Sequence, residues 1–193
     1  MSRHTALKTA TRPLLAATLL VSLTGCGFQL RGASPIPATL QPLSLECSAK
    51  VSDTLCRSVR DQLELSGLTL TPAADADYRL HLDNFKQDRR ATAVSSDGSA
   101  AQYTLRLSVS LELITADGVP LIADTRLSAS DSYSYDDTQV LAGEKEENSL
   151  GSLLADQLAQ QVSFRLAPMT EARIQAIRDE YEASGAGKDT GTP

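Results

Sequence analysis

The segment Tyr103–Leu113 constrains the fold more than any other part of the chain. Apolar side chains stand at every second position of this segment, and polar side chains fill the positions between them. An alternation of this length predicts a β-strand with one buried face and one polar face, and it leaves little room for a helix. The apolar positions are Tyr103, Leu105, Leu107, Val109, Leu111 and Leu113.

The residues after this strand predict a long β-hairpin. Asp117-Gly118 is a turn dipeptide, so residues 120–135 are expected to run back beside the first strand. A shorter alternating segment near the start of the domain, Leu43–Cys47, predicts another strand.

The residues before the hairpin predict one more strand, at 78–87. Phe85 breaks its alternation, which indicates a β-bulge near Asn84. The small and polar residues that follow contain Asp97-Gly98, a second turn signal.

Two segments have helical periodicity. The first begins at Ser52 or Asp53 and extends to Ser66, with apolar residues at fourfold spacing along one face and Gly67 after it. The second, residues 144–168, starts with acidic side chains and ends near Arg165, which suits the dipole of a helix.

The resulting order is strand, helix, three strands, helix. This order predicts an α+β fold, a two-layer sandwich in which an about four-stranded, mostly antiparallel sheet carries two helices packed on one face. The other face of the long hairpin remains polar, so it must meet either water or a polar partner.

The N-terminus has the pattern of a secretory signal peptide, with a basic start and a short apolar run at residues 13–23. A transmembrane anchor is the alternative, but the run falls short of the roughly 20 residues that a bilayer requires. Leu23-Thr24-Gly25-Cys26 resembles the bacterial lipobox, in which the cysteine is lipidated and becomes the first residue of the mature protein. Because Gly27 rather than Asp follows it, this resemblance points to the periplasmic side of the outer membrane.

The chain is therefore divided into a lipoprotein signal peptide at 1–25, a lipidated cysteine with a Pro-rich tether at 26–42, a single α+β domain at 43–168, and a short helix with a disordered tail at 169–193. The signal peptide holds three of the 18 basic residues and none of the 24 acidic ones, which leaves a mature net charge of −9. Such an acidic chain is a poor binder of nucleic acid.

The remaining cysteines, Cys47 and Cys56, are expected to form a disulfide in an oxidising periplasm. A metal site is the alternative, but His81 is the only histidine outside the signal peptide, too few ligands for a tetrahedral set. His81 has no nucleophile motif around it, and the chain has no glycine-rich phosphate loop. We therefore expect no enzyme activity, no metal and no cofactor.

Four segments resemble the LPS-assembly lipoprotein family, LptE, in the same order. They are the mature start CGFQLRG at 26–32, RSVRDQLELSGLTL at 57–70, SDGSAAQYTLRLSVSLEL at 96–113 and YSYDDTQVLAGEKEENSL at 133–150. The resemblance covers roughly residues 26–167. It implies a plug inside the lumen of an LptD-type outer-membrane β-barrel, where the pair moves lipopolysaccharide into the outer leaflet and the plug assists assembly of the barrel.

The resemblance also suggests roles for individual residues. Because the lumen of such a barrel is polar, Arg106, Ser108 and Ser110 on the polar strand face are expected to face the barrel. The turn at 95–98 lacks the basic residue common in the family, so Lys145 and Arg90 become the candidates for binding lipopolysaccharide. The alternative function is an auxiliary periplasmic lipoprotein of another lipid transport system.

Overall fold

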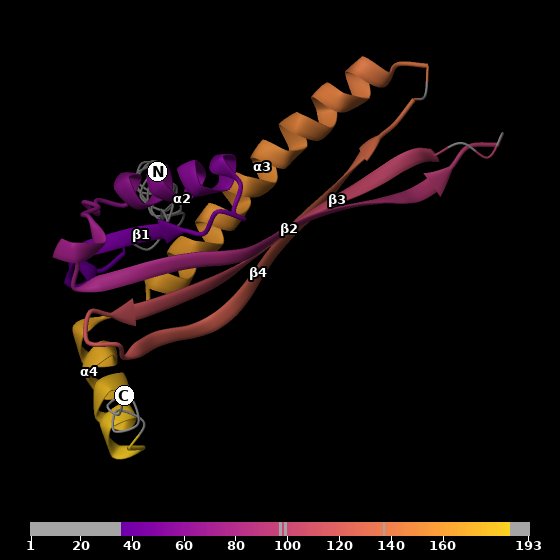
Figure 1. Cartoon of the computed structure of the whole chain (residues 1–193). Helices are drawn as coiled ribbons and strands as arrows, with labels where there is room; N and C mark the ends of the chain where they lie inside the picture. Colours follow the sequence, from indigo (N-terminus) through magenta and orange to yellow (C-terminus); the bar gives the residue numbers. More distant parts are fainter. Residues whose placement is uncertain (1–35, 97, 99, 137, 186–193) are drawn as a thin grey trace, which may run out of the picture. The chain divides into compact units, whose positions relative to one another are not determined.

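The computed structural model describes residues 36–96, 98, 100–136 and 138–185. Within these residues, one sheet of four strands has the order β1-β2-β3-β4 (Figure 1). The strands are β1 (Leu43–Cys47), β2 (Tyr78–Val94), β3 (Ala100–Thr115) and β4 (Pro120–Ser134). β1 runs parallel to β2, and the other neighbouring pairs are antiparallel. The expected α+β sandwich is confirmed.

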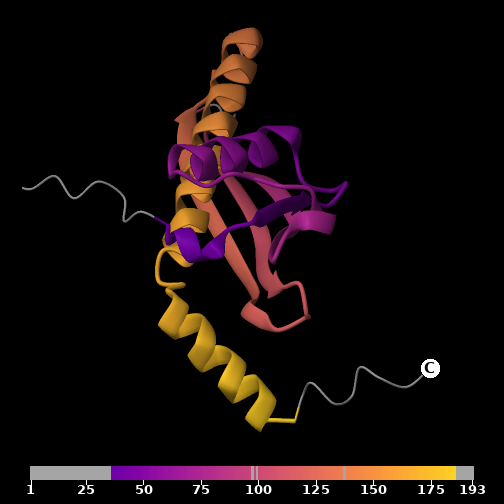
Figure 2. The same cartoon turned by 90° about the vertical axis from the view of Figure 1, so that its left-hand side faces the viewer.

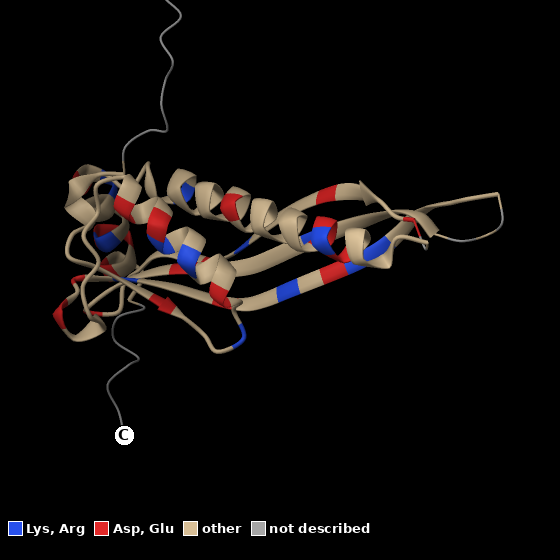
Figure 3. Cartoon of the chain, turned by 90° about the horizontal axis from the view of Figure 1, so that it is seen from above, with Lys and Arg blue, Asp and Glu red and all other residues tan. Residues whose placement is uncertain are grey.

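Two helices, α2 (Asp53–Leu65) and α3 (Val140–Leu166), lie over one side of this sheet (Figure 3). Ser52 caps α2 by accepting a hydrogen bond from the backbone N–H of Leu55, and Gly67, with φ +86°, follows the helix. The helices pack on the apolar side of β3, where the alternating residues become fully buried. These core residues include Leu105, Val109, Leu111, Leu113, Leu154 and Leu158.

The strands β2 and β3 are longer than the sequence pattern predicts. β2 continues to Val94 although its last residues are exposed, because backbone hydrogen bonds to β3 hold them without any burial. The bulge expected near Asn84 is present: the register shifts between Asp83 and Lys86, and Asn84 has φ 53°. Across this bulge the same side of β2 stays toward the helices, with the buried Leu80 and Leu82 before it and the exposed Gln87 and Arg89 after it.

The start of α3 was predicted wrongly. The helix begins at Val140 rather than near Glu144, and its first turn contains no acidic residue. Glu144, Glu146 and Glu147 therefore lie inside the helix, where Glu144 and Glu146 are exposed and Glu147 pairs with Arg89 of the sheet.

A further helix, α4 (Glu171–Ala183), follows α3 beyond the β3–β4 turn (Figure 2). Ile174 buries its side chain in the core, and the Arg178 guanidinium donates hydrogen bonds of 2.7 and 3.1 Å to the Asp117 carboxylate. These hydrogen bonds lower the pKa of Asp117. No helix among the described residues is long and apolar enough to cross a bilayer.

Candidate functional site

The side of the sheet opposite α2 and α3, here called the open face, is polar along β2, β3 and β4. The strand register sets which residues share it, since paired residues on neighbouring strands point the same way. Among its residues are Asp88, Arg90, Thr104, Arg106, Ser108, Ser110, Arg126, Ser128 and Ser130. The open face thus combines hydroxyl groups with exposed guanidinium groups.

Two neighbouring hollows lie on the open face. One, of about 250 Å³, is lined by Arg90 and Arg106 together with Asp88, Thr92, Thr104 and Ser130. The other, of about 340 Å³, is lined by Asp88, Arg106, Ser108, Arg126 and Ser128. Arg106 and Asp88 belong to both hollows, so the two form a continuous polar depression.

Hydrogen bonds across β3 and β4 orient two of these arginines. Arg126 on β4 donates to the Ser108 hydroxyl at 2.6 Å, and Arg106 on β3 donates to the Ser128 hydroxyl at 3.5 Å. Ser108 and Ser128 are themselves paired across the two strands. Both guanidinium groups therefore approach the same pair of hydroxyls from opposite directions.

The three residues expected to face a barrel differ in exposure. Arg106 is exposed, whereas Ser108 and Ser110 are 4% and 9% exposed although they lie on the open face. Ser108 lies beneath the Arg126 side chain. A partner on this face would meet the arginines first, and direct contact with the serines stays a prediction.

On the opposite, helix-facing side, a cluster of four residues joins α3 to the far end of the sheet, meaning the end away from β1. These residues are Arg89, Tyr103, Tyr133 and Glu147. The Arg89 guanidinium pairs with the Glu147 carboxylate at 3.1 Å and stacks 3.8 Å from the centre of the Tyr103 ring. Tyr133 donates its hydroxyl to Glu147 at 2.5 Å, and burial, followed by this hydrogen bond, raises the pKa of Tyr133 to about 12. Glu147 is thus the polar centre of this cluster.

The two candidate ligand-binding residues are not brought together. Arg90 lies on the open face, on β2. Lys145 is an exposed residue of α3, the helix that covers the opposite side of the sheet. The two side chains lie in different layers and share no contact among the described residues, and each role stays a prediction.

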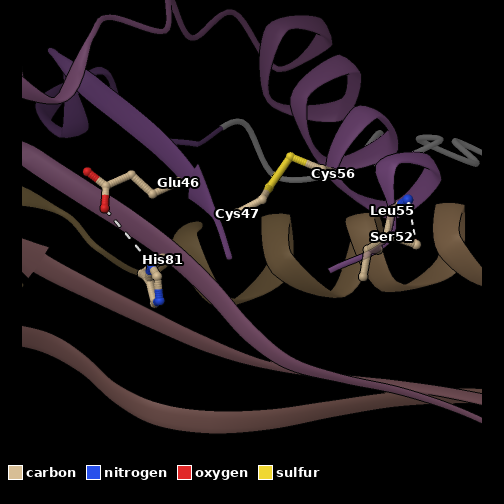
Figure 4. Close-up of a disulfide and its surroundings, with 6 residues drawn as sticks. All are labelled: Glu46, Cys47, Ser52, Leu55, Cys56 and His81. Atoms are coloured by element: carbon tan, nitrogen blue, oxygen red, sulfur yellow. Dashed lines mark hydrogen bonds and ion pairs between the residues drawn. A yellow bond between two sulfur atoms is a disulfide. The ribbon is translucent and has the colours of Figure 1, made fainter. Parts of the chain in front are cut away.

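The expected disulfide between Cys47 and Cys56 is present and ties β1 to α2 (Figure 4). His81 lies near Glu46, with 3.9 Å between Nδ1 and Oε2, and it lines a small hollow with Asp83, Glu112 and Asp124. No cluster of His, Cys, Asp or Glu that could hold a metal ion occurs among the described residues. Cys26, the expected site of lipidation, lies outside the described residues.

The fold is shared with lipoproteins of known structure. The crystal structure of a minor lipoprotein from Acinetobacter baumannii has a TM-score of 0.55 at 27% identity, over 65% of this chain and 90% of that one. The solution structure of a lipoprotein B from Nitrosomonas europaea has a TM-score of 0.59 at 19% identity, over 78% of this chain and 97% of that one. These likenesses define the class by its fold, an α+β domain of the kind found in those lipoproteins.

Sequence comparison then gives the family. The family model LptE, lipopolysaccharide-assembly, matches residues 38–166. An LPS-assembly lipoprotein LptE of Photorhabdus laumondii is 30% identical over 176 residues, 91% of this chain and 94% of that protein. One of Yersinia enterocolitica is 28% identical over 179 residues, 91% of this chain and 84% of that protein. The chain belongs to the LptE family of lipopolysaccharide-assembly proteins.

Proposed function

We propose that this protein is an outer-membrane lipoprotein that plugs an LptD-type β-barrel, helps it to assemble, and assists the insertion of lipopolysaccharide into the outer leaflet. Membership of the LptE family supports a role in lipopolysaccharide assembly. The open face supports the more specific role of a plug, because a polar sheet face several strands wide suits the polar lumen of an outer-membrane barrel.

The anchor of this plug is a lipid on Cys26, held at the periplasmic side of the outer membrane. Several acyl chains bury enough CH₂ groups, at about 0.8 kcal/mol each, to keep a folded domain on a membrane. The Pro-rich segment 26–42 then connects the lipid to the α+β domain at 43–168, and its described end is anchored to the domain by the buried Ile36 and Leu40. The domain needs no cofactor or catalytic group for this role.

Contacts with lipopolysaccharide are assigned to Lys145 and Arg90, as two separate contacts on opposite sides of the sheet. Both residues are exposed, so their charges are available to a phosphate group. We assign no contact with lipopolysaccharide to residues 169–193.

A photo-crosslinking amino acid at Arg106, in living cells, tests the plug. Arg106 is exposed on the open face, and Arg165 on α3 is the matched control, since it is an exposed arginine on the helix layer. We expect a single heat-modifiable adduct with a large outer-membrane protein from Arg106 and a different or weaker pattern from Arg165.

Adducts from Arg106 only with soluble periplasmic or inner-membrane proteins would refute the plug. The protein would then be better described as an auxiliary periplasmic lipoprotein of another lipid transport system.

A further inference from the structure

We propose that Arg106 and Arg126 form a clamp on the open face for a carboxylate side chain of the partner protein. The clamp consists of these two arginines and the paired hydroxyls of Ser108 and Ser128, and it lies in the hollow of about 340 Å³. This inference rests on the proposed function, since the partner that would present the carboxylate is the barrel.

The convergence of two like charges is the first argument. Arg126 reaches from β4 to Ser108 and Arg106 reaches from β3 to Ser128, so each guanidinium group contacts one member of the same cross-strand pair. Neither arginine makes an ion pair with a carboxylate within the described part of the chain. Like charges held together repel each other, and an anion placed between them removes that repulsion.

The hydrogen-bonding capacity of the hollow is the second argument. Ser108 and Ser128 each accept a hydrogen bond from an arginine, which leaves the hydrogen of each hydroxyl free to be donated. The guanidinium N–H groups and the free hydroxyl hydrogens together offer several donors to a ligand placed over them, and Asp88 is the one carboxylate among the residues that line the hollow. A donor-rich site of this kind fits a carboxylate, whose two oxygens only accept.

The charge of the hollow selects a carboxylate over a phosphoryl group. Two of the residues that line it are positive and one, Asp88, is negative. The net charge of +1 matches one ionised carboxylate, whereas a phosphoryl group with nearly two negative charges would be partly repelled by Asp88. A side chain pointing inward from a barrel strand would reach this depression end-on, because such side chains stand roughly perpendicular to the strand.

The charge pattern along the open face would also set the register of docking. The hollow around His81 carries Asp83, Glu112 and Asp124, so a more acidic part of this face lies next to the arginine clamp. A partner shifted along the sheet would place its carboxylate against these acids. Repulsion of that kind disfavours the wrong register.

Charge variants of the full-length lipoprotein, purified from outer membranes together with its barrel, test the clamp. Arg106→Gln and Arg126→Gln keep hydrogen-bonding groups but remove the charges, and Arg126→Glu reverses one charge. Arg165→Gln and Arg165→Glu on α3 are the matched controls. Circular dichroism of each purified variant shows whether it is folded.

We expect the glutamine variants to lower recovery of the complex several-fold and Arg126→Glu to lower it by roughly tenfold or more, while both Arg165 variants behave as wild type. A photo-crosslinker at Ser130, at the edge of the depression, then maps the contacted segment of the barrel. Replacing an acidic residue of that segment by lysine is expected to restore pairing with Arg126→Glu.

The outcomes separate the clamp from the plug. If the Ser130 adduct with the barrel persists but no clamp variant changes recovery, the clamp is refuted and the plug stands. If Ser130 gives no barrel adduct even in the wild type, both fail. If recovery is unchanged but the variants lose binding of inorganic phosphate by the purified protein, the hollow is a phosphoryl site and the carboxylate assignment is overturned.

Discussion

At the scale of single residues, the clearest feature is the connection that Glu147 makes between α3 and the sheet. Glu147 accepts a hydrogen bond from Tyr133 and pairs with Arg89, which stacks on Tyr103. Tyr133 is only 4% exposed, so its hydroxyl has lost most of its contact with water and depends on Glu147 for a partner.

Tyr133→Phe should therefore destabilise the protein at neutral pH but not at very alkaline pH. The pKa of Tyr133 is raised from 10 to about 12 by burial and by Glu147, so its stabilising effect is complete below pH 10 and is lost as the pH rises through 12. We expect a stability difference of about 2 kcal/mol at neutral pH that shrinks toward zero near pH 12. Urea unfolding of both proteins across this range measures the difference.

Glu147→Gln is the companion variant, because it removes the charge and leaves the burial of Tyr133. Since burial is the larger cause of the shift, the pKa of Tyr133 should fall only part of the way to its ordinary value of 10. NMR of labelled tyrosine rings follows this titration. A complete return to 10 would mean that Glu147 alone raises the pKa.

At the scale of elements, helix α3 contains a matched pair of glycines. A Cβ at Gly143 would lie 3.0 Å from two atoms of the Tyr135 ring, whereas a Cβ at Gly151 would only touch a Leu105 methyl group at 3.9 Å. The Tyr135 ring is held edge-on to Tyr103, with ring centres 5.2 Å apart, so it cannot shift without disturbing that contact.

Gly151→Ala should stabilise the protein by about 1 kcal/mol, since alanine is the better helix former. Gly143→Ala gains the same helix propensity but must displace the Tyr135 ring, so we expect it to be at least about 1 kcal/mol less stable than Gly151→Ala. Thermal and urea unfolding of both variants provide the comparison. Equal stabilisation by the two would show that the ring moves freely.

The Cys47–Cys56 disulfide joins two elements that are close in sequence, β1 and α2. Closing so short a loop is worth about 2–3 kcal/mol in the chain-entropy account, so the double variant Cys47→Ser, Cys56→Ser should lose about that much stability. Reductant should lower the stability of the wild type similarly and leave the double variant unchanged. A loss well below 1 kcal/mol would show that the sheet and the core already hold β1 against α2.

At the scale of the whole molecule, the layers could be predicted from the sequence and the clamp could not. The alternation from Tyr103 to Leu113 predicts which side of β3 is buried, because that pattern is local. Arg126 could have been placed on the polar side in the same way, since it alternates in the sequence with Thr125, Leu127 and Ala129. Its position opposite Ser110 and beside Ser108 depends on the pairing of β3 with β4, which a single-strand pattern does not contain.

The same limit applies to the far end of the sheet. β2 reaches Val94 through pairing with β3, and Glu147 of α3 pairs with Arg89 of β2 although the two residues are far apart in the sequence. Both features are set by contacts between segments distant in sequence.

The two-sided arrangement of the molecule leads to a prediction about the ligand candidates. Arg90 on the open face and Lys145 on α3 share no contact among the described residues, and the sheet lies between their layers.

Side chains so separated should act independently, so the effects of Arg90→Ala and Lys145→Ala on lipopolysaccharide binding should add to within about 0.5 kcal/mol in the double variant. Arg165→Ala serves as the control for a general loss of positive charge. The measurement is titration of the purified full-length lipoprotein in detergent with lipopolysaccharide. A coupling well above 1 kcal/mol would mean that one ligand spans the edge of the sheet and touches both residues, and binding unchanged in all variants would remove both residues from the ligand site.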